Sequence, residues 1–156
     1  MSSSTRRTPS GDLDEERLHG LVGYQLAQAT VATDRVFRQQ VGEPFGLRPV
    51  EYTLLTLIGD NPGGSSSSLA QALAVTAPNI TMWIDRLVGR GLVRRRQSST
   101  DRRKQELRLS AEGVRLVAQA TDRLVEGERA ALGGLSSAER AMLLELLHKV
   151  AQLRNS

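Results

Sequence analysis

The sequence predicts a mainly α-helical protein that carries one short, two-stranded β-hairpin. Apolar residues recur at helical spacing near both ends and through the middle of the 156-residue chain, and Gly-, Pro- and Ser-rich segments separate these runs. After the middle helices, two short segments with interleaved Arg and apolar residues flank a polar loop, which is typical of a hairpin. The length suits one compact domain with a helical extension and leaves no room for a second, catalytic domain.

Composition excludes several kinds of site. The chain has no cysteine, so disulfides, thiolate metal ligands and a cysteine-oxidation switch are excluded. His19 and His148 lie far apart without a neighbouring His or Cys, and we expect no metal and no cofactor. No apolar run approaches the roughly 20 residues of a membrane span. Residues 1–12 lack an apolar signal core, and we expect them to be the disordered tail of a cytoplasmic protein that does not contact the membrane.

A long amphipathic helix is predicted near the N-terminus, from Leu13 to about Val41. The segment Gly42–Gly46, which contains Pro44, is expected to end it. A helix of this length with an apolar stripe offers more surface than one small lobe can cover. We therefore expect residues 13–46 to form a dimerisation helix in a two-fold homodimer.

The middle of the chain predicts a helix-turn-helix. A helix begins at Pro49, where the missing N–H of proline is tolerated in the first turn. The Gly- and Ser-rich run Asp60–Ser68 follows as a surface loop, with a domain linker as the alternative. A short helix, about Ser68–Leu73, a tight turn, and a helix from about Ala77 to Arg90 with Thr76 as its N-cap complete the motif.

The following segments predict a wing and a long helix. Leu92–Gln97 and Lys104–Leu109 are expected to pair as two strands around the loop Ser98–Arg103. Ser110 then begins a helix that ends before Gly133. Its residues expected to face inward are Val114, Val117, Leu124 and Val125.

The last helix is predicted from a capping box, S-x-x-E, formed by Ser136 and Glu139. Its apolar stripe consists of Leu143, Leu146, Leu147, Val150 and Leu153. We assign residues 47–110 to a winged helix-turn-helix lobe and residues 111–156 to dimerisation helices that form one intertwined domain with the N-terminal helix.

Basic residues concentrate in one segment. The net charge of the whole chain is only +4, but between Asp85 and Arg108 nine basic and three acidic residues give +6, which leaves −2 for the rest. Affinity for DNA comes from cations that displace condensed counterions from its phosphates. A charged face that only serves solubility would be spread along the chain. The distribution therefore favours a DNA-binding middle segment.

The helix Ala77–Arg90 has one apolar and one polar face. At 100° per residue, Ile80, Ile84 and Leu87 fall on the face expected to be buried. The opposite face is small, polar and cationic, so it can enter a major groove. Its side chains suggest contacts of Asn79 with adenine, of Arg86 with guanine or a phosphate, of Met82 with a thymine methyl group, and of the Thr76 and Thr81 hydroxyls with phosphates. At the wing tip, Arg102 and Arg103 have the length to reach into a minor groove, with Asp101 bracing one of them.

These motifs resemble a known family. The run Leu69–Gly113 is similar to the winged-helix core of the MarR (multiple antibiotic resistance regulator) family, including a wing pattern D-x-R followed by L-[ST]-x-x-G. The long terminal helices resemble that family as well. One departure is Ala74, which stands where many members have Gly. The resemblance implies an intertwined dimer whose recognition helices and wings read adjacent grooves of a palindromic operator. It selects as DNA contacts Thr76, Pro78, Asn79, Thr81, Arg86, Asp101 and Arg103.

The resemblance also implies regulation by a ligand. Members of the family usually repress transcription, and small aromatic or phenolic molecules bound between the dimer helices and the DNA-binding lobe release them. An Arg can pair with a carboxylate and aromatic rings can stack on an aromatic ligand. The residues with this chemistry in the expected region are His19, Tyr24, Arg48 and Tyr52.

Three other functions remain as alternatives. A constitutive or architectural DNA-binding protein would use the same helix and wing without an effector. A protein-interaction module would use the Arg-rich hairpin to contact an acidic partner, although the outward Asn79 and Arg86 argue against it. An enzyme has the least support, because the sequence shows no paired carboxylates, phosphate-binding glycine loop or Ser/His/Asp constellation.

Overall fold

The structure, a computed structural model, describes residues 7–99, 101 and 105–155. These residues form two compact units. We call residues 37–130 the lobe, and residues 1–36 together with 131–156 the terminal unit. Within the described ranges, no helix has both the length and the apolar character that crossing a bilayer requires.

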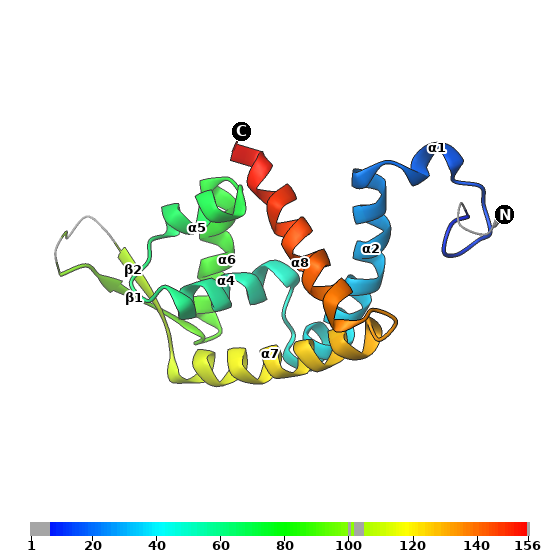
Figure 1. Ribbon diagram of the computed structural model, residues 1–156. Coiled ribbons are helices and arrows are strands. Elements are labelled where there is room, and N and C mark those ends of the chain that lie inside the picture. Colours follow the sequence, from blue (N-terminus) through cyan, green and yellow to red (C-terminus); the bar gives the residue numbers. More distant parts are fainter. Residues whose placement is uncertain (1–6, 100, 102–104, 156) are drawn as a thin grey trace. The chain divides into compact units, whose positions relative to one another are not determined.

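The lobe is helical with one antiparallel hairpin (Figure 1). In chain order it contains a π-helical turn (Arg38–Gly42), α3 (Glu43–Phe45), α4 (Pro49–Asp60), α5 (Ser66–Leu73), α6 (Ala77–Gly89), β1 (Val93–Gln97), β2 (Gln105–Leu109) and most of α7 (Ala111–Ala131). Val93 pairs with Leu109 and Gln97 with Gln105, so the hairpin is in regular antiparallel register. The mainly α fold with a two-stranded wing is confirmed.

The core of the lobe joins α4, α6 and the hairpin. Leu54 and Ile58 of α4, Ile84 and Leu87 of α6, and Leu107 of β2 are each at most 2% exposed. Each such buried side chain contributes about 1.5–3 kcal/mol relative to an exposed one. The lobe therefore holds α6 rigidly by its apolar face.

The loop before α5 differs in two ways from the predicted one. α5 begins at Ser66, two residues earlier than expected, because the Ser65 hydroxyl accepts a hydrogen bond from the backbone N–H of Ser68 at 3.2 Å. Gly64 also forms a β-bridge with Leu107, whose N–H donates to the Gly64 carbonyl at 3.0 Å. The segment is thus tied to the wing as a connection inside one unit, and it is not a domain linker.

The sequence predicts one continuous N-terminal helix, but the structure divides it. In the terminal unit, α1 (Glu16–His19) and α2 (Val22–Phe37) are separated at Gly20 and Leu21. At the other end the helical path continues through Gly42 and Pro44 and stops at Gly46, which has a left-handed φ of +60°. Pro44 lacks the N–H that an α-helix uses, and the preceding π-helical turn is the local adjustment that accompanies it.

The C-terminal helices begin as predicted. α8 (Ser137–Gln152) is capped by Ser136, whose backbone N–H donates to Glu139 Oε2 at 2.7 Å, and it is followed by a 3₁₀ turn (Leu153–Asn155). In α7, Val117 and Leu124 pack against the core as expected. Val114 and Val125 do not face inward, because they are 56% and 52% exposed.

Candidate nucleic-acid interface

The turn between α5 and α6 sets the direction of α6. Ala74 takes the left-handed conformation, with φ +52°, and its N–H bonds back to the Gln71 carbonyl. The Val75 N–H donates to the Ala70 carbonyl at 3.0 Å, so the turn is closed by two backbone hydrogen bonds. On α6 itself, Ile80, Ile84 and Leu87 are at most 1% exposed. The opposite face of α6 is thereby turned to the solvent.

The first turn of α6 is open to an anion. Thr76 is the N-cap residue, but its side chain makes no capping hydrogen bond. Pro78 lies within the first turn, and both it and Asn79 are exposed. The first N–H groups of a helix have no partner inside the helix and attract negative charge. Thr81 differs from Thr76, because its hydroxyl donates to the Ala77 carbonyl at 2.9 Å and keeps only its acceptor capacity free.

Further along the same face, Met82 is 56% exposed and Arg86 is half-exposed. Arg86 Nε lies 3.0 Å from Oε1 of Glu51, whose side chain is fully buried in α4. The N–H does not point at this oxygen well enough to count as a hydrogen bond, so the contact is an ion pair without hydrogen-bond alignment. Glu51 Oε2 accepts a hydrogen bond from the Arg48 backbone N–H at 2.8 Å.

A second arginine, Arg90, ties the end of α6 to the segment before α4 by hydrogen bonds. The two terminal nitrogens of Arg90 donate to the carbonyls of Phe45 and Gly46, each at 2.8 Å. These carbonyls end the helical segment that precedes α4. Arg86 and Arg90 are one helical turn apart, so α6 contacts α4 through the first and the end of α3 through the second.

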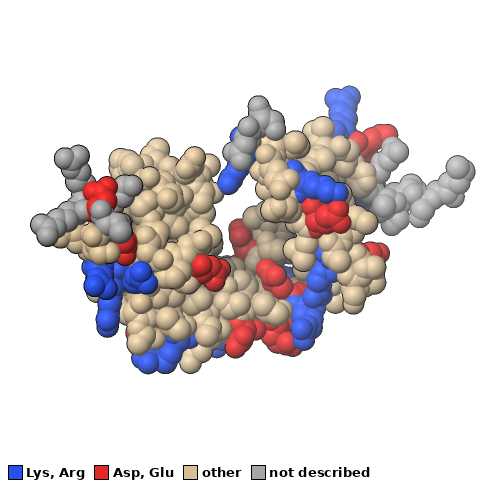
Figure 2. Space-filling model, turned by 60° about the vertical axis from the view of Figure 1, so that its left-hand side comes forward, with Lys and Arg blue, Asp and Glu red and all other residues tan. Residues whose placement is uncertain are grey.

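The wing is strongly basic. Arg94 and Arg108 stand opposite each other in the hairpin, and Arg96 stands opposite Glu106. Arg95 pairs with Asp85 at 2.6 Å, which links the hairpin to α6. In Figure 2, blue side chains gather at the wing end of the lobe. Asp101 is half-buried, while the predicted contacts Arg102 and Arg103 lie outside the described residues.

The motif L-[ST]-x-x-G after the wing has a packing explanation. The Ser110 N–H donates to the Leu92 carbonyl at 2.9 Å, and the Ser110 hydroxyl accepts from the Gly113 N–H at 3.0 Å. A Cβ at Gly113 would lie 2.2 Å from the Leu92 carbonyl oxygen. The serine starts α7 and the glycine lets α7 pass close to the start of the wing.

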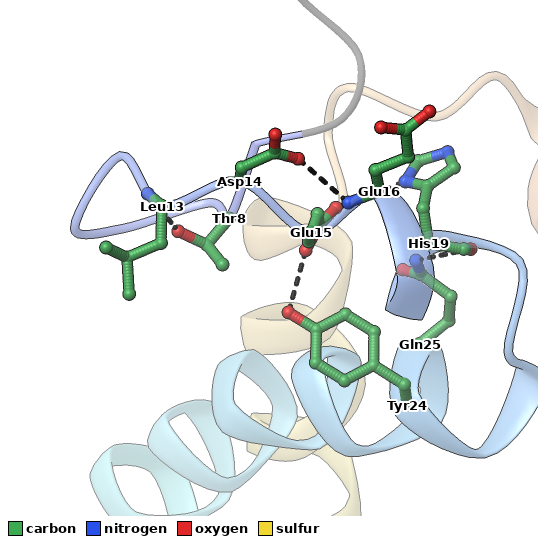
Figure 3. Close-up of polar contacts among 8 residues, drawn as sticks. All are labelled: Thr8, Leu13, Asp14, Glu15, Glu16, His19, Tyr24 and Gln25. Atoms are coloured by element: carbon green, nitrogen blue, oxygen red, sulfur yellow. Dashed lines mark hydrogen bonds and ion pairs between the residues drawn. The ribbon is translucent and has the colours of Figure 1, made fainter.

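Two of the four predicted ligand-binding residues meet in the terminal unit. The Tyr24 hydroxyl donates to Glu15 Oε2 at 2.7 Å, and His19 Nδ1 lies 3.1 Å from Glu15 Oε1 (Figure 3). The hydrogen bond from Tyr24 and then that from His19 hold the pKa of the Glu15 carboxyl below its usual range, and the same carboxylate raises the pKa of Tyr24. Glu15, which the sequence reasoning missed, is therefore the centre of this cluster.

The other two predicted ligand-binding residues, Arg48 and Tyr52, belong to the lobe. The Tyr52 hydroxyl lies 2.8 Å from the Thr121 hydroxyl, and its ring packs 5.9 Å from that of Phe37. Arg48 is exposed at the start of α4. The lobe has a separate concavity of about 410 Å³, where the Arg123 guanidinium lies 5.9 Å from the centre of the Phe45 ring. It is lined by Pro44, Phe45, Gln119, Asp122 and Arg123 and by none of the four candidates.

Sequence reasoning also missed Glu51 and Arg90. Glu51 follows Pro49 by two residues, at the third position of a helix where an acidic side chain commonly caps the backbone, and this spacing could have identified it as a cap. Nothing in the sequence indicated that its second oxygen would meet Arg86. The sequence predicts Arg90 only as the end of the helix Ala77–Arg90, because its partners lie 44 and 45 residues away in the chain.

Comparison with known proteins gives independent evidence on the family of this chain. Residues 47–104 match the model of the MarR family. The chain is 32% identical over 131 residues to a protein of Thauera aromatica named as a transcriptional regulator for the hcr operon, covering 84% of this chain and 79% of that protein. It is 30% identical over 147 residues to the HTH-type transcriptional regulator PecS of Dickeya dadantii, covering 92% and 87% of the two chains.

Among solved structures, the chain is similar to the transcriptional repressor CouR bound to a 23-mer DNA duplex, with a TM-score of 0.82, 31% identity and coverage of 89% of this chain and 98% of CouR. Members of the matching family are transcription regulators and not enzymes. The exposed face of α6, the basic wing and these likenesses lead to one conclusion: this chain belongs to the MarR family and is a transcriptional regulator of the winged-helix type.

Proposed function

We propose that this protein is a homodimeric repressor that binds a palindromic operator and is released by a small aromatic acid or phenol. The DNA-binding part of the proposal rests on one observation, which is that α6 has a buried apolar face and an exposed polar face. Its apolar face is buried in the lobe, while Asn79, Met82 and half of Arg86 are exposed next to a basic hairpin. The likeness to CouR, a repressor seen on DNA, supports the same part.

Each exposed side chain has an assigned role in this proposal. α6 lies in the major groove, where Asn79 pairs with adenine, Met82 contacts a thymine methyl group and Arg86 contacts guanine or a phosphate. Thr76, Pro78 and the first N–H groups of α6 approach a phosphate, and Thr81 joins them by turning its hydroxyl proton from the Ala77 carbonyl to a phosphate oxygen. In the wing, Arg102 and Arg103 enter the minor groove, and Asp101 braces one of them.

The homodimer is supported by apolar surface on α8. No residue of α8 is buried within the described chain, and its residues Leu143, Leu146, Leu147 and Val150 are 36–50% exposed. Two copies would cover these stripes and space two recognition helices for half-sites about one helical turn apart. Sedimentation showing a monomer at micromolar concentration would refute the dimer.

The effector is supported by aromatic and charged side chains and by one further likeness. His19, Tyr24, Arg48 and Tyr52 carry the rings and the guanidinium that an aromatic acid requires. The chain is 25% identical to BpsR of Bordetella bronchiseptica, whose DNA binding is described as regulated by 6-hydroxynicotinic acid, with a TM-score of 0.76 and coverage of 86% of this chain and 95% of BpsR.

The test is binding to DNA fragments that flank the protein's own gene, across a salt series, with aromatic acids and phenols added in parallel. We expect selective, salt-dependent binding that one compound weakens, and loss of preference for one base pair in Asn79→Ala. If no compound weakens binding, the protein has a constitutive or architectural role in place of the proposed release by an effector. Equal binding to random DNA by the wild type would refute the proposal.

A further inference from the structure

A buried carboxylate stands behind the exposed face of α6. Glu51 is fully buried, and its Oε2 is already used by the Arg48 backbone N–H. Its other oxygen lies 3.0 Å from Arg86 Nε. The charge of Glu51 is therefore balanced by a side chain that is itself 47% exposed on the recognition helix.

The ion pair is not aligned as a hydrogen bond, but it decides which edge of the guanidinium lies nearest to Glu51. An Arg side chain presents Nε on one edge and its two terminal nitrogens farther out, in a planar fork. With Nε held against Glu51, the ion pair occupies the inner edge. Among the described residues, no other polar partner of the Arg86 side chain is found. The outer nitrogens remain for a ligand on the same helical face as Asn79 and Met82.

We propose that Glu51 is a positioning residue for DNA reading: it holds the inner edge of Arg86 so that the outer edge meets a guanine or a phosphate. This inference rests on the proposed operator binding and adds a residue that does not itself touch DNA. Because Glu51 also caps α4 through Arg48, the orientation of Arg86 is linked to the start of α4.

The alternative is that the ion pair only holds α4 against α6. That explanation is weaker, because removing a carboxylate from water is costly and apolar residues of similar volume commonly stabilise helix packing as well or better. The pair is also surrounded by an apolar interface that already joins the helices through Leu54, Ile58, Ile84 and Leu87. The cap of α4 needs only Oε2 of Glu51, whereas Oε1 lies against Arg86, where an apolar residue could not attract a guanidinium.

The experiment is a double-mutant cycle in which operator affinity is measured. The variants are Glu51→Gln, Arg86→Gln and the two combined, each in the full-length protein and each checked for thermal unfolding. Glu126→Gln is the matched control, because Glu126 is 74% exposed on α7 and its substitution also removes one negative charge, which by itself raises the affinity for DNA. Affinity is measured at several salt concentrations on the operator and on operators changed at single base pairs.

We expect Glu51→Gln to bind the operator about tenfold more weakly than Glu126→Gln. Arg86→Gln should lose a similar factor, and it should lower the salt slope by about 0.9 if Arg86 meets a phosphate or lose preference at one base pair if it meets guanine. The combined variant should bind no more weakly than Arg86→Gln alone, because the proposed effect of Glu51 on DNA binding is exerted through Arg86, and the glutamine at position 51 keeps an oxygen for the Arg48 N–H. Additive losses, or a Glu51→Gln protein that binds like Glu126→Gln, would overturn the inference while leaving the proposed function intact.

Arg86→Lys covers the case in which Glu51→Gln does not fold. Lysine keeps the positive charge but has no planar fork with an inner and an outer edge. We expect Arg86→Lys to bind the operator more weakly than the wild type, although its charge retains part of the affinity that Arg86→Gln loses. Wild-type affinity and base preference in Arg86→Lys would overturn the inference. A wild-type protein without preference for any fragment would instead refute the proposed function, and this inference with it.

Discussion

The recognition helix α6 and the C-terminal helix α8 carry similar apolar stripes but use them differently. Ile80, Ile84 and Leu87 of α6 are at most 1% exposed. On α8, Leu144 is 64% exposed and Leu147 is 36% exposed, and no residue of that helix is buried among the described part of the chain. The lobe thus completes its own core, whereas the stripe on α8 needs a further surface.

The largest expected effect separates these two helices directly. Ile84→Ala in the lobe should lower the free energy of unfolding by about 2–5 kcal/mol, because it leaves a cavity in a closed core. Leu147→Ala on α8 should mainly weaken dimerisation, so its cost should depend on protein concentration. Urea denaturation at two protein concentrations measures both. Equal and concentration-independent losses would remove the distinction between the helices.

Two glycines extend the comparison to the backbone. Gly113 of α7 passes so close to Leu92 that Gly113→Ala should cost about 1–3 kcal/mol of stability. A Cβ at Gly23 of α2, in the terminal unit, would meet no neighbouring atom within 4 Å, and Gly23→Ala should stabilise by roughly 0.5–1 kcal/mol. Thermal unfolding of both variants gives the signs. Destabilisation by Gly23→Ala would reveal a partner surface packed against that face of α2.

A smaller effect is expected at the turn of the helix-turn-helix. Ala74 adopts a left-handed φ of +52°, which costs an L-residue with a Cβ about 1–2 kcal/mol. Ala74→Gly should relieve this strain, and part of the gain should be offset by the greater freedom of glycine in the unfolded chain. We expect a net stabilisation of about 0.5–1 kcal/mol in urea denaturation, with unchanged operator preference. A destabilised Ala74→Gly variant would contradict the strain argument.

The same contrast shows what the sequence could predict. The burial of Ile80, Ile84 and Leu87 followed from their helical spacing, because one small lobe offers a single apolar interior. The capping of α8 by Ser136 and Glu139 was equally local, since both partners lie within one turn of the chain. Spacing could not predict the break at Gly20, because the apolar period runs across it.

Contacts between distant segments were beyond the sequence. In the linear sequence Glu51 and Arg86 have the pattern of ordinary surface residues, and only the packing of α4 on α6 brings their charges to 3.0 Å. Arg90 was likewise predictable as a helix end but not as a donor to the carbonyls of Phe45 and Gly46. The polar links that orient the recognition helix depend on tertiary structure, whereas its apolar and exposed faces depend on local periodicity.

The smallest expected effect concerns acid stability of the terminal unit. The Ser136 backbone N–H, followed by the Ser136 hydroxyl contact, holds the pKa of the Glu139 carboxyl below its usual range. A carboxyl whose pKa is lower in the folded state stabilises the fold above its unfolded-state pKa and loses this contribution as pH falls through the folded-state pKa. Glu139→Gln does not titrate at position 139, so its unfolding free energy should decline less steeply than that of the wild type as the pH falls below about 4.5.

Glu15, whose pKa is lowered by Tyr24 and His19, should account for part of the remaining decline, and Glu15→Gln combined with Glu139→Gln should flatten it further. Urea denaturation between acidic and neutral pH measures these slopes, and identical slopes in all three proteins would show that neither carboxyl is held by its partners in solution.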